Sequence, residues 1–296
     1  MYKKISMILC ILLCVLHTGC VQQTKEETTK EETKKATDIT VVATSVTVCE
    51  ILEALQVENV IGVPETTSYT LPEIYKETTK VGVAMNPDIE VIAHLQPTYV
   101  LSPQSLASDL QSKYEIAGIP FYFLDLSSTQ GMYTSIIELG ELLDVREQAE
   151  ELYSDFEKYM EIYSAENLED VKPKVLVLMG LPASYVVATS ESYVGSLVEL
   201  AGGENVYTGG EEGFLNVNPE DMLSKNPDVI LLTSHALPEQ VEKMFEEEFS
   251  KNDIWKFFEA VKNERVHTLN HEKFGMSANF RYREGLTDLQ EILYEK

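Results

Sequence analysis

The sequence is poor in basic residues and in long apolar runs. Its 23 Lys and Arg stand against 49 Asp and Glu, and the net charge of -26 would repel nucleic acid over most of the surface. The one continuous apolar run, Ile5 to Leu16, would extend only about 18 Å as a helix, too short to cross a bilayer. With 15 Gly and 11 Pro in 296 residues, a collagen-like chain is excluded. These absences, with 44% hydrophobic residues, predict a globular protein that binds no nucleic acid.

The short motifs of common enzymes are also missing. There is no Gly-x-Ser-x-Gly, no phosphate-binding Gly-rich loop and no His-Glu-x-x-His. The thiol of Cys49 falls in a predicted helix, where a small buried residue suffices. We therefore expect no enzymatic activity.

The first residues have the order of an export signal, with Lys3 and Lys4 before the apolar run and Thr18-Gly19-Cys20 after it. This order predicts a signal peptide over residues 1–19. A Cys after a small pair resembles a bacterial lipobox, which implies acylation of Cys20, as with palmitate, and anchoring on the outer face of the cell membrane. The lipobox usually has Leu three residues before the Cys, where this chain has His17, so a plain secretion signal remains the alternative.

Residues 20–38 are predicted to form a lipidated Cys followed by a solvated tether. Val21 to Asp38 shows no apolar period, and Lys-Glu-Glu-Thr occurs twice within it. Cys10 and Cys14 leave with the signal, so Cys49 has no cysteine partner in the mature chain.

An ordered α/β lobe is predicted over residues 39–144. A helix with its apolar residues three and four apart follows the first strand, and Thr47 and Glu50 have the spacing of a capping box at its start. Further helices are expected to start near Pro87 and Ser105. Short apolar runs predict a mainly parallel sheet with helices on both faces, from strands at Ile39–Val42, Val60–Val63, Val81–Val83, Tyr99–Leu101 and Phe121–Leu124.

A long helix over residues 145–168 is predicted to connect this lobe to a second one. Its apolar residues follow a 4,3,4,3,4 spacing from Val145 to Tyr163, which gives a single apolar stripe along about 30 Å. A second α/β lobe, 169–296, is predicted from a closing helix around Leu286–Tyr294 and strands at Lys174–Met179, Val186–Ala188, Val229–Leu232 and Val266–Leu269.

The two lobes share a short pattern of helix, proline and strand. Asn86-Pro87-Asp88 leads to Pro97 and a strand, and Asn218-Pro219-Glu220 leads to Pro227 and a strand. Glu90 and Glu220 each stand seven residues before their proline. Two equivalent short helices would therefore each carry a glutamate at the same position. The alternative is that the match is accidental, because a helix, a proline and a strand often follow one another in α/β proteins.

With these features, the chain resembles the class III solute-binding proteins of bacterial ABC importers, which carry iron chelates, cobalamin, haem or metals. Val42–Leu52, Val81–Asp88 and Phe274–Asn279 are similar to the haem-receptor lipoproteins of Gram-positive iron-regulated surface-determinant systems. The resemblance implies two Rossmann-like α/β lobes joined by one long helix, with haem b in the cleft between them. It also implies an ABC permease with its ATPase as partners, a possible haem donor protein and a monomer.

When this sequence is matched to these receptors motif by motif, the two residues that ligate the haem iron correspond to Met85 and His235. Each follows a predicted strand, and open parallel sheets bind ligands beyond the carboxyl ends of their strands. A thioether and a neutral imidazole are a known axial pair for haem iron. Met85 could instead be a hydrophobic staple before an N-cap at Asn86, although Glu90 is then a poor N4 residue. His235 could be an ordinary loop histidine, and we interpret His94, His267 and His271 as structural or surface residues.

Other residues of the predicted cleft are less specific. The haem propionates could use backbone N–H groups at the first helix and hydroxyl groups of the segment after the second strand. The resemblance also places Met276 in the cleft. The predicted cleft residues are therefore Ser45, Val46, Thr47, Thr67, Ser68, Tyr69 and Met276. It also implies that Glu90 and Glu220 dock on arginines of the permease, unless they are two solvated glutamates among many.

A ferric-siderophore or cobalamin receptor of the same family is the alternative function. In that interpretation Met85 is incidental, and an anionic chelate would face Tyr69, Lys273, Arg281 and Arg283.

Overall fold

The computed structural model describes residues 39–166, 171–210 and 212–294. The predicted signal peptide, Cys20 and the tether lie outside the described residues. No helix within the described ranges has both the length and the hydropathy that a membrane span requires.

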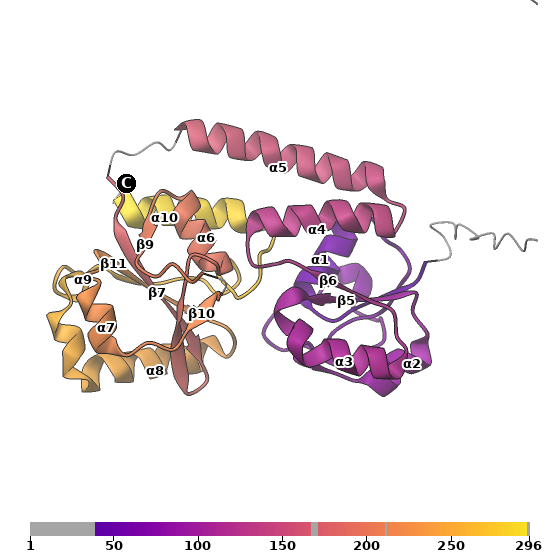
Figure 1. The fold of residues 1–296 in the computed structure, drawn as a ribbon, viewed down its shortest axis with the longest axis horizontal. Coiled ribbons are helices and arrows are strands. Elements are labelled where there is room, and N and C mark those ends of the chain that lie inside the picture. Colours follow the sequence, from indigo (N-terminus) through magenta and orange to yellow (C-terminus); the bar gives the residue numbers. More distant parts are fainter. Residues whose placement is uncertain (1–38, 167–170, 211, 295–296) are drawn as a thin grey trace, which may run out of the picture. The chain divides into compact units, whose positions relative to one another are not determined.

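The first sheet is fully parallel and has the strand order β2-β1-β5-β6. Its strands β5 and β6 are labelled in Figure 1. Alternate residues of β1 enter different cores, since Val41 and Ala43 pack with α1 and α4 whereas Val42 packs with α2 and α3. Helices thus cover both faces, as predicted. The elements are β1 (Val41–Ala43), β2 (Val60–Gly62), β5 (Tyr99–Pro103), β6 (Phe121–Leu124), α1 (Val46–Ala54), α2 (Ile89–Leu95), α3 (Ala107–Ala117), α4 (Thr129–Leu142) and the 3-10 helices η2 (Glu73–Tyr75) and η3 (Gln104–Leu106).

Two local predictions in this lobe are wrong. The N-cap of α1 is Ser45, whose hydroxyl accepts a hydrogen bond from Val48 N at 3.3 Å, so the capping box predicted at Thr47 and Glu50 does not form. The strand predicted at Val81–Val83 is not part of the parallel sheet. It is β3 (Gly82–Val83), which forms a small antiparallel hairpin with β4 (Asn86–Pro87).

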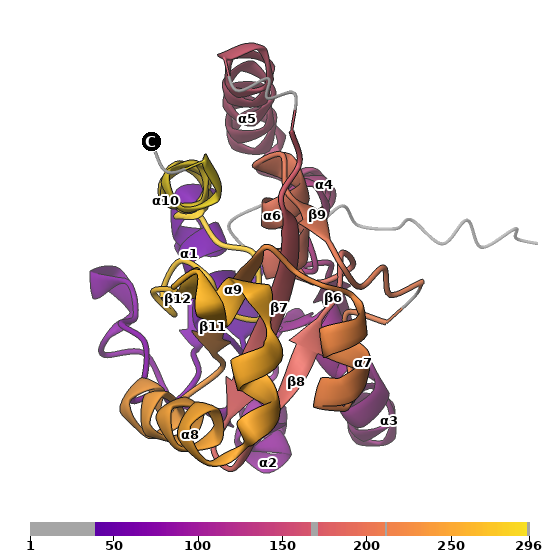
Figure 2. The same ribbon diagram turned by 90° about the vertical axis from the view of Figure 1, so that its left-hand side faces the viewer.

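The second sheet is mixed, with the order β10-β8-β7-β11-β12 and β9 beside the start of β7. Val175, Val177 and Met179 of β7 pack toward α6 and α10, while Leu176 and Leu178 pack toward α8, so helices cover both faces (Figure 2). The elements are β7 (Lys174–Leu181), β8 (Ser184–Ala188), β9 (Glu204–Asn205), β10 (Phe214–Leu215), β11 (Val229–Ser234), β12 (Val266–Thr268), α6 (Tyr193–Leu200), α7 (Pro219–Ser224), α8 (Pro238–Lys251), η4 (Asp253–Phe257), α9 (Glu259–Lys262) and α10 (Tyr282–Tyr294).

The long helix is α5 (Arg146–Glu166), and it buries the predicted stripe. Ala149, Phe156 and Tyr163 are buried on it, and Phe156 stacks on Tyr133 of α4 with the ring centroids 4.2 Å apart. A Cβ at Gly140 of α4 would lie 2.5 Å from the Cβ of Ala149, so the close packing of α4 on α5 requires glycine there. The stripe is confirmed, whereas the lobe boundaries at 39–144 and 169–296 stay a prediction.

The repeat of helix, proline and strand has the same geometry in both lobes. Glu90 is the second residue of α2, and Glu220 is the second residue of α7. Gln96 and Asn226, which directly precede Pro97 and Pro227, are both left-handed with φ of 49°. In each lobe the sheet strand then begins two residues after the proline, at β5 and at β11.

Candidate functional site

Met85 lies in the two-residue turn of the β3–β4 hairpin. Met85 is 62% exposed, and Val83, two residues earlier, is 51% exposed. The N-cap of α2 is Asp88, whose carboxylate accepts from the amides of Glu90 and Val91. Asn86 is therefore not the cap, and the staple alternative for Met85 does not apply. The turn holds a thioether out where a ligand can reach it.

His235 directly follows β11, at the carboxyl end of a parallel strand, as predicted. Its backbone N–H donates to Gly180 O at 3.1 Å, which extends the pairing of β11 with β7 by one residue. The imidazole is half-buried, and this burial lowers its pKa below the ordinary value. The ring is therefore neutral at physiological pH, which is the form that binds a metal.

Met85 has a different setting from the one predicted. Its hairpin stands outside the parallel sheet and is attached to the segment after β2, because Glu65 N donates to Gly82 O at 2.8 Å. Among the described residues, no hydrogen bond links Met85 to His235. The structure does bring Tyr69 of that same segment to His235, since the phenol donates to the backbone carbonyl of His235 at 3.3 Å.

The predicted propionate donors at α1 are partly in use. The Ser45 hydroxyl accepts a hydrogen bond from Val48 N. The amides of Val46 and Thr47, at the start of the helix, have no acceptor within the helix. Glu50 is turned to Arg281 of the second lobe, with Nη1 and Oε1 2.9 Å apart.

The remaining predicted cleft residues lie in two loops. Thr67 is exposed and Ser68 half-buried in the bend after β2. Met276 is half-buried in the loop before α10 and packs against the main core. In that loop Ala278 N donates to Leu126 O at 2.9 Å, which ties the loop to the first lobe.

The cations that an anionic chelate would need are each paired with carboxylates. Lys273 Nζ lies 2.8 Å from Asp288 and 3.7 Å from Glu284. Arg281 pairs with Glu50, and Arg283 bonds to Asp155 at 2.6 Å while its guanidinium lies over the Tyr159 ring. The chelate alternative therefore loses the positive charge on which it depends.

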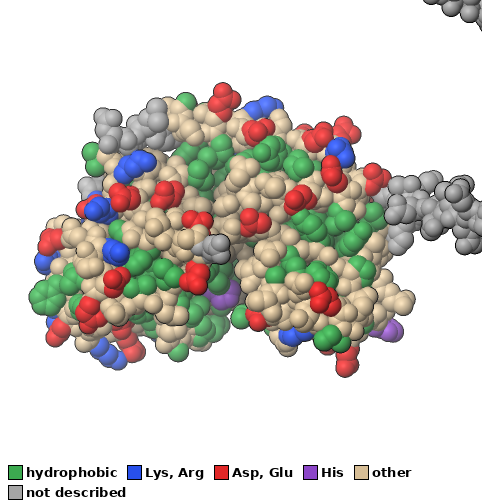
Figure 3. Space-filling view, in the orientation of Figure 1, with side chains coloured by type: hydrophobic (Ala, Val, Ile, Leu, Met, Phe, Trp, Pro, Cys, Tyr) green, Lys and Arg blue, Asp and Glu red, His purple; other side chains and the backbone are tan. Residues whose placement is uncertain are grey.

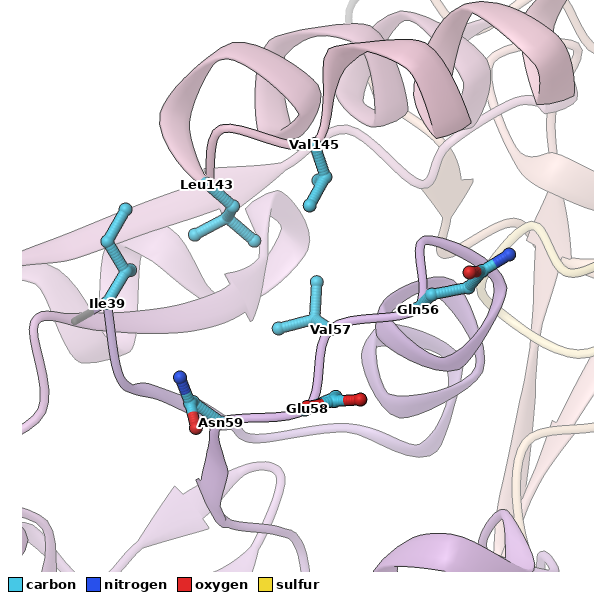
Figure 4. A pocket seen from close by; sticks show the side chains of 7 residues that line it. All are labelled: Ile39, Gln56, Val57, Glu58, Asn59, Leu143 and Val145. Carbon is cyan, nitrogen blue, oxygen red and sulfur yellow. The ribbon is translucent and has the colours of Figure 1, made fainter. Parts of the chain in front are cut away.

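Three cavities lie at the ends of the strands, one at amino ends and two at carboxyl ends. One of about 170 Å³ (Figure 4) includes Ile39 and Asn59, which precede β1 and β2, so it lies at the amino ends of strands and is small for a ligand. A second, of about 360 Å³, is lined by Ser234 and His271 at the carboxyl ends of β11 and β12, and a third, of about 460 Å³, is lined by Gln104 and Asp125 at the carboxyl ends of β5 and β6. Ser234, which lines the second cavity, directly precedes His235, but neither His235 nor Met85 lines any of these three cavities.

Sequence reasoning missed some of the contacts around the site. His271, interpreted as structural or surface, has its ring 5.8 Å from that of Tyr69. The pairing of Glu50 with Arg281 joins residues 231 positions apart, for which a single sequence carries no signal. Cys49 is free and buried, and burial raises the pKa of its thiol to about 12, in agreement with a packing role.

Acidic side chains are spread over the face seen in Figure 3 and do not gather in one patch. A histidine side chain is visible in the hollow near the middle of that face (Figure 3). Glu90 and Glu220 are both exposed in the first turns of their helices, where the helix dipole favours a carboxylate.

Two α/β lobes, one long helix and candidate ligands on a turn of each lobe define a solute-binding protein. The chain belongs to the periplasmic binding protein family, whose model matches residues 41–272. It is 37% identical over 283 residues to the high-affinity heme uptake system protein IsdE of Staphylococcus aureus, covering 95% of this chain and 94% of that protein.

Solved structures agree with this assignment. An ABC transporter substrate-binding protein from Listeria monocytogenes is 41% identical, with a TM-score of 0.81 over 87% of this chain and 99% of that one. S. aureus IsdE complexed with heme is 38% identical, with a TM-score of 0.82 over the same shares. The predicted fold of two lobes joined by a long helix is confirmed.

Proposed function

We propose that this protein captures haem between its lobes and delivers it to an ABC permease, with Met85 and His235 as the axial ligands of the iron. One observation carries the proposal. An exposed thioether and a half-buried neutral imidazole lie on turns of opposite lobes, and the segment of residues 63–69 contacts both the Met85 hairpin, at Gly82, and the carbonyl of His235. The similarity to IsdE, which was solved with heme, supports the same ligand.

The donor set suits haem iron better than a bare cation. A soft thioether and an imidazole form a known axial pair in haem proteins, whereas Mn²⁺ or a similar hard ion prefers carboxylates. Because burial lowers the pKa of His235, no proton has to leave the imidazole before it binds at neutral pH.

The net charge of -26 does not prevent binding of a dianionic porphyrin. Repulsion from surface carboxylates is screened beyond about 8 Å at physiological ionic strength and amounts to about 1–2 kcal/mol. Burial of several hundred Å² of porphyrin contributes on the order of 10 kcal/mol before ordering costs. Apolar contact therefore dominates the affinity.

The propionates are proposed to lie near the start of α1, where the amides of Val46 and Thr47 are available beside Ser45. Thr67 and Ser68 would add hydroxyl groups, and Met276 would add an apolar contact from the second lobe. A ferric siderophore or cobalamin is less favoured, because Lys273, Arg281 and Arg283 are already paired.

The protein is proposed to act as a lipid-anchored monomer on the outer face of the bacterial cell membrane. Acylation of Cys20 would anchor it, and the tether to residue 38 would keep the folded part near the permease. The protein would itself catalyse nothing, since the partner ATPase supplies the transport energy. A separate haem donor protein could load it.

Docking on the permease is assigned to Glu90 and Glu220. Both are exposed at the second position of equivalent helices, one in each lobe. Ion pairs with permease arginines would orient the protein and raise the association rate more than the affinity.

Titration of the purified protein with haemin tests the proposed ligand. We expect saturation at one equivalent and the sharp visible bands of a six-coordinate, low-spin haem. Ferric siderophores and cobalamin, added in tenfold excess, should not displace it. Tight binding of either competitor with no defined haem spectrum would contradict the proposal and favour the alternative receptor.

A further inference from the structure

The side chain of Tyr69 belongs to the first lobe, but its contacts lie in the second. Its hydroxyl donates to His235 O at 3.3 Å, and its ring lies 5.8 Å from that of His271 at an interplanar angle of 55°. A Cβ at Gly275 would stand 3.3 Å from the Tyr69 hydroxyl, tighter than ordinary van der Waals contact. Tyr69 thus contacts the turn after β11 and the loop after β12 together.

The backbone leading to Tyr69 is fixed to the hairpin that holds Met85. Val81 N donates to Val63 O at 3.0 Å, and Glu65 N donates to Gly82 O at 2.8 Å. Tyr69 N donates to Thr66 Oγ1 at 3.3 Å, which closes the turn just before the phenol. A short, hydrogen-bonded path therefore runs from the Met85 hairpin through residues 63–69 to the carbonyl of His235.

The His235 turn is held on its own lobe by other means. His235 N bonds to Gly180 O, and Leu237 has a left-handed backbone with φ 51° and ψ 57°, directly before Pro238 begins α8. A leucine adopts this conformation only where the surroundings fix it. These features fix the two ends of the turn to its own lobe, and the hydrogen bond from Tyr69 links the turn to the Met85 side.

We propose that Tyr69 is a positioning residue, which sets the orientation of His235 relative to the Met85 hairpin. The inference rests on the proposed function, because the two turns matter as a pair only if both ligate one iron. A phenol has one proton, so a hydroxyl that donates to His235 O cannot also donate to a propionate. Tyr69 therefore acts through His235, and the propionates take their donors from other residues.

Tyr69→Phe is the direct test, because it keeps the ring against His271 and removes only the hydroxyl. Loss of one neutral hydrogen bond predicts about fivefold faster haem dissociation. The electron paramagnetic resonance spectrum of the ferric complex should also change its g-value spread, since the imidazole plane is no longer held in one orientation. If the Tyr69 hydroxyl only stabilised the fold, its removal would leave the spread of g values unchanged.

Tyr294→Phe is the matched control. Tyr294 also donates through its phenol to a backbone carbonyl, Gly202 O, at 3.0 Å, but it lies in the last helix, α10. We expect wild-type haem dissociation and g values for this variant. Wild-type dissociation and g values in Tyr69→Phe as well would overturn the inference.

A measurement without haem separates this inference from the proposed function. Amide hydrogen exchange of the peptide containing Ala236 and Leu237 should be several-fold faster in Tyr69→Phe than in wild type, and unchanged in Tyr294→Phe. If the wild type binds no haem, the proposed function fails, and faster exchange still supports Tyr69 as the residue that holds the turn. Equal exchange in both variants contradicts that role whether or not haem binds.

Discussion

Haem loss from a His235→Ala variant is expected to be at least about 100-fold faster than from wild type. Removal of a residue that merely supports a ligand costs about 10- to 100-fold in metal affinity, so removal of the ligand should cost no less. The turn itself should persist, because the contacts of His235 with Gly180 and Tyr69 use its backbone N–H and carbonyl. Transfer of haem to an excess of apomyoglobin measures the rate.

His94→Ala is the control for this change. His94 is exposed in the last turn of α2, and its removal should leave the rate of haem loss at the wild-type value. A His235→Ala variant that retains haem as long as the His94→Ala variant would show that another group ligates the iron.

Charge reversal of both proposed docking residues, Glu90→Lys with Glu220→Lys, should abolish haem import while leaving haem binding intact. Two lysines would then face the permease arginines, so that like charges would repel each other where two ion pairs are proposed. A lysine in the first turn of a helix opposes the dipole and lowers the free energy of unfolding by only about 0.3–1 kcal/mol per site, so the protein should still fold. Growth on haem as the sole iron source measures import.

Glu239→Lys is a matched control for the charge reversal. Glu239 is the second residue of α8 and follows a proline, as Glu220 follows Pro219 in α7. It is also exposed, so its reversal makes the same local change at a position outside the repeat. Import should remain normal in this control. Normal import in the double reversal would remove Glu90 and Glu220 from the docking surface.

The parts of the fold that could be predicted are those fixed by local apolar pattern. Phe121–Leu124 is the strand β6, and the predicted stripe lies on the buried side of α5. The repeat was visible because a left-handed residue lies within two residues of the end of each short helix and is followed directly by proline, and proline marks that end in the sequence.

The missed features depend on residues that are distant in sequence. Two hydroxyl residues near the start of α1 can each cap a helix; Ser45 is the cap in the structure, and Glu50 pairs with Arg281. Val81–Val83 has the composition of a sheet strand, but Gly82 is left-handed and the chain reverses within two residues. The contact of Tyr69 with His235 spans 166 residues, and no local pattern predicts it.

The most direct test of the account is the identity of the two axial atoms in the ferric haem complex. X-ray absorption with near-infrared magnetic circular dichroism is expected to find one sulfur and one imidazole nitrogen. Met85→Ala should remove the sulfur signal, and Met160→Ala, in α5, should retain it. Because Met85 is 62% exposed, its replacement should not disturb the fold. A sulfur signal that survives in Met85→Ala, or a wild-type complex without sulfur, would contradict ligation from both lobes.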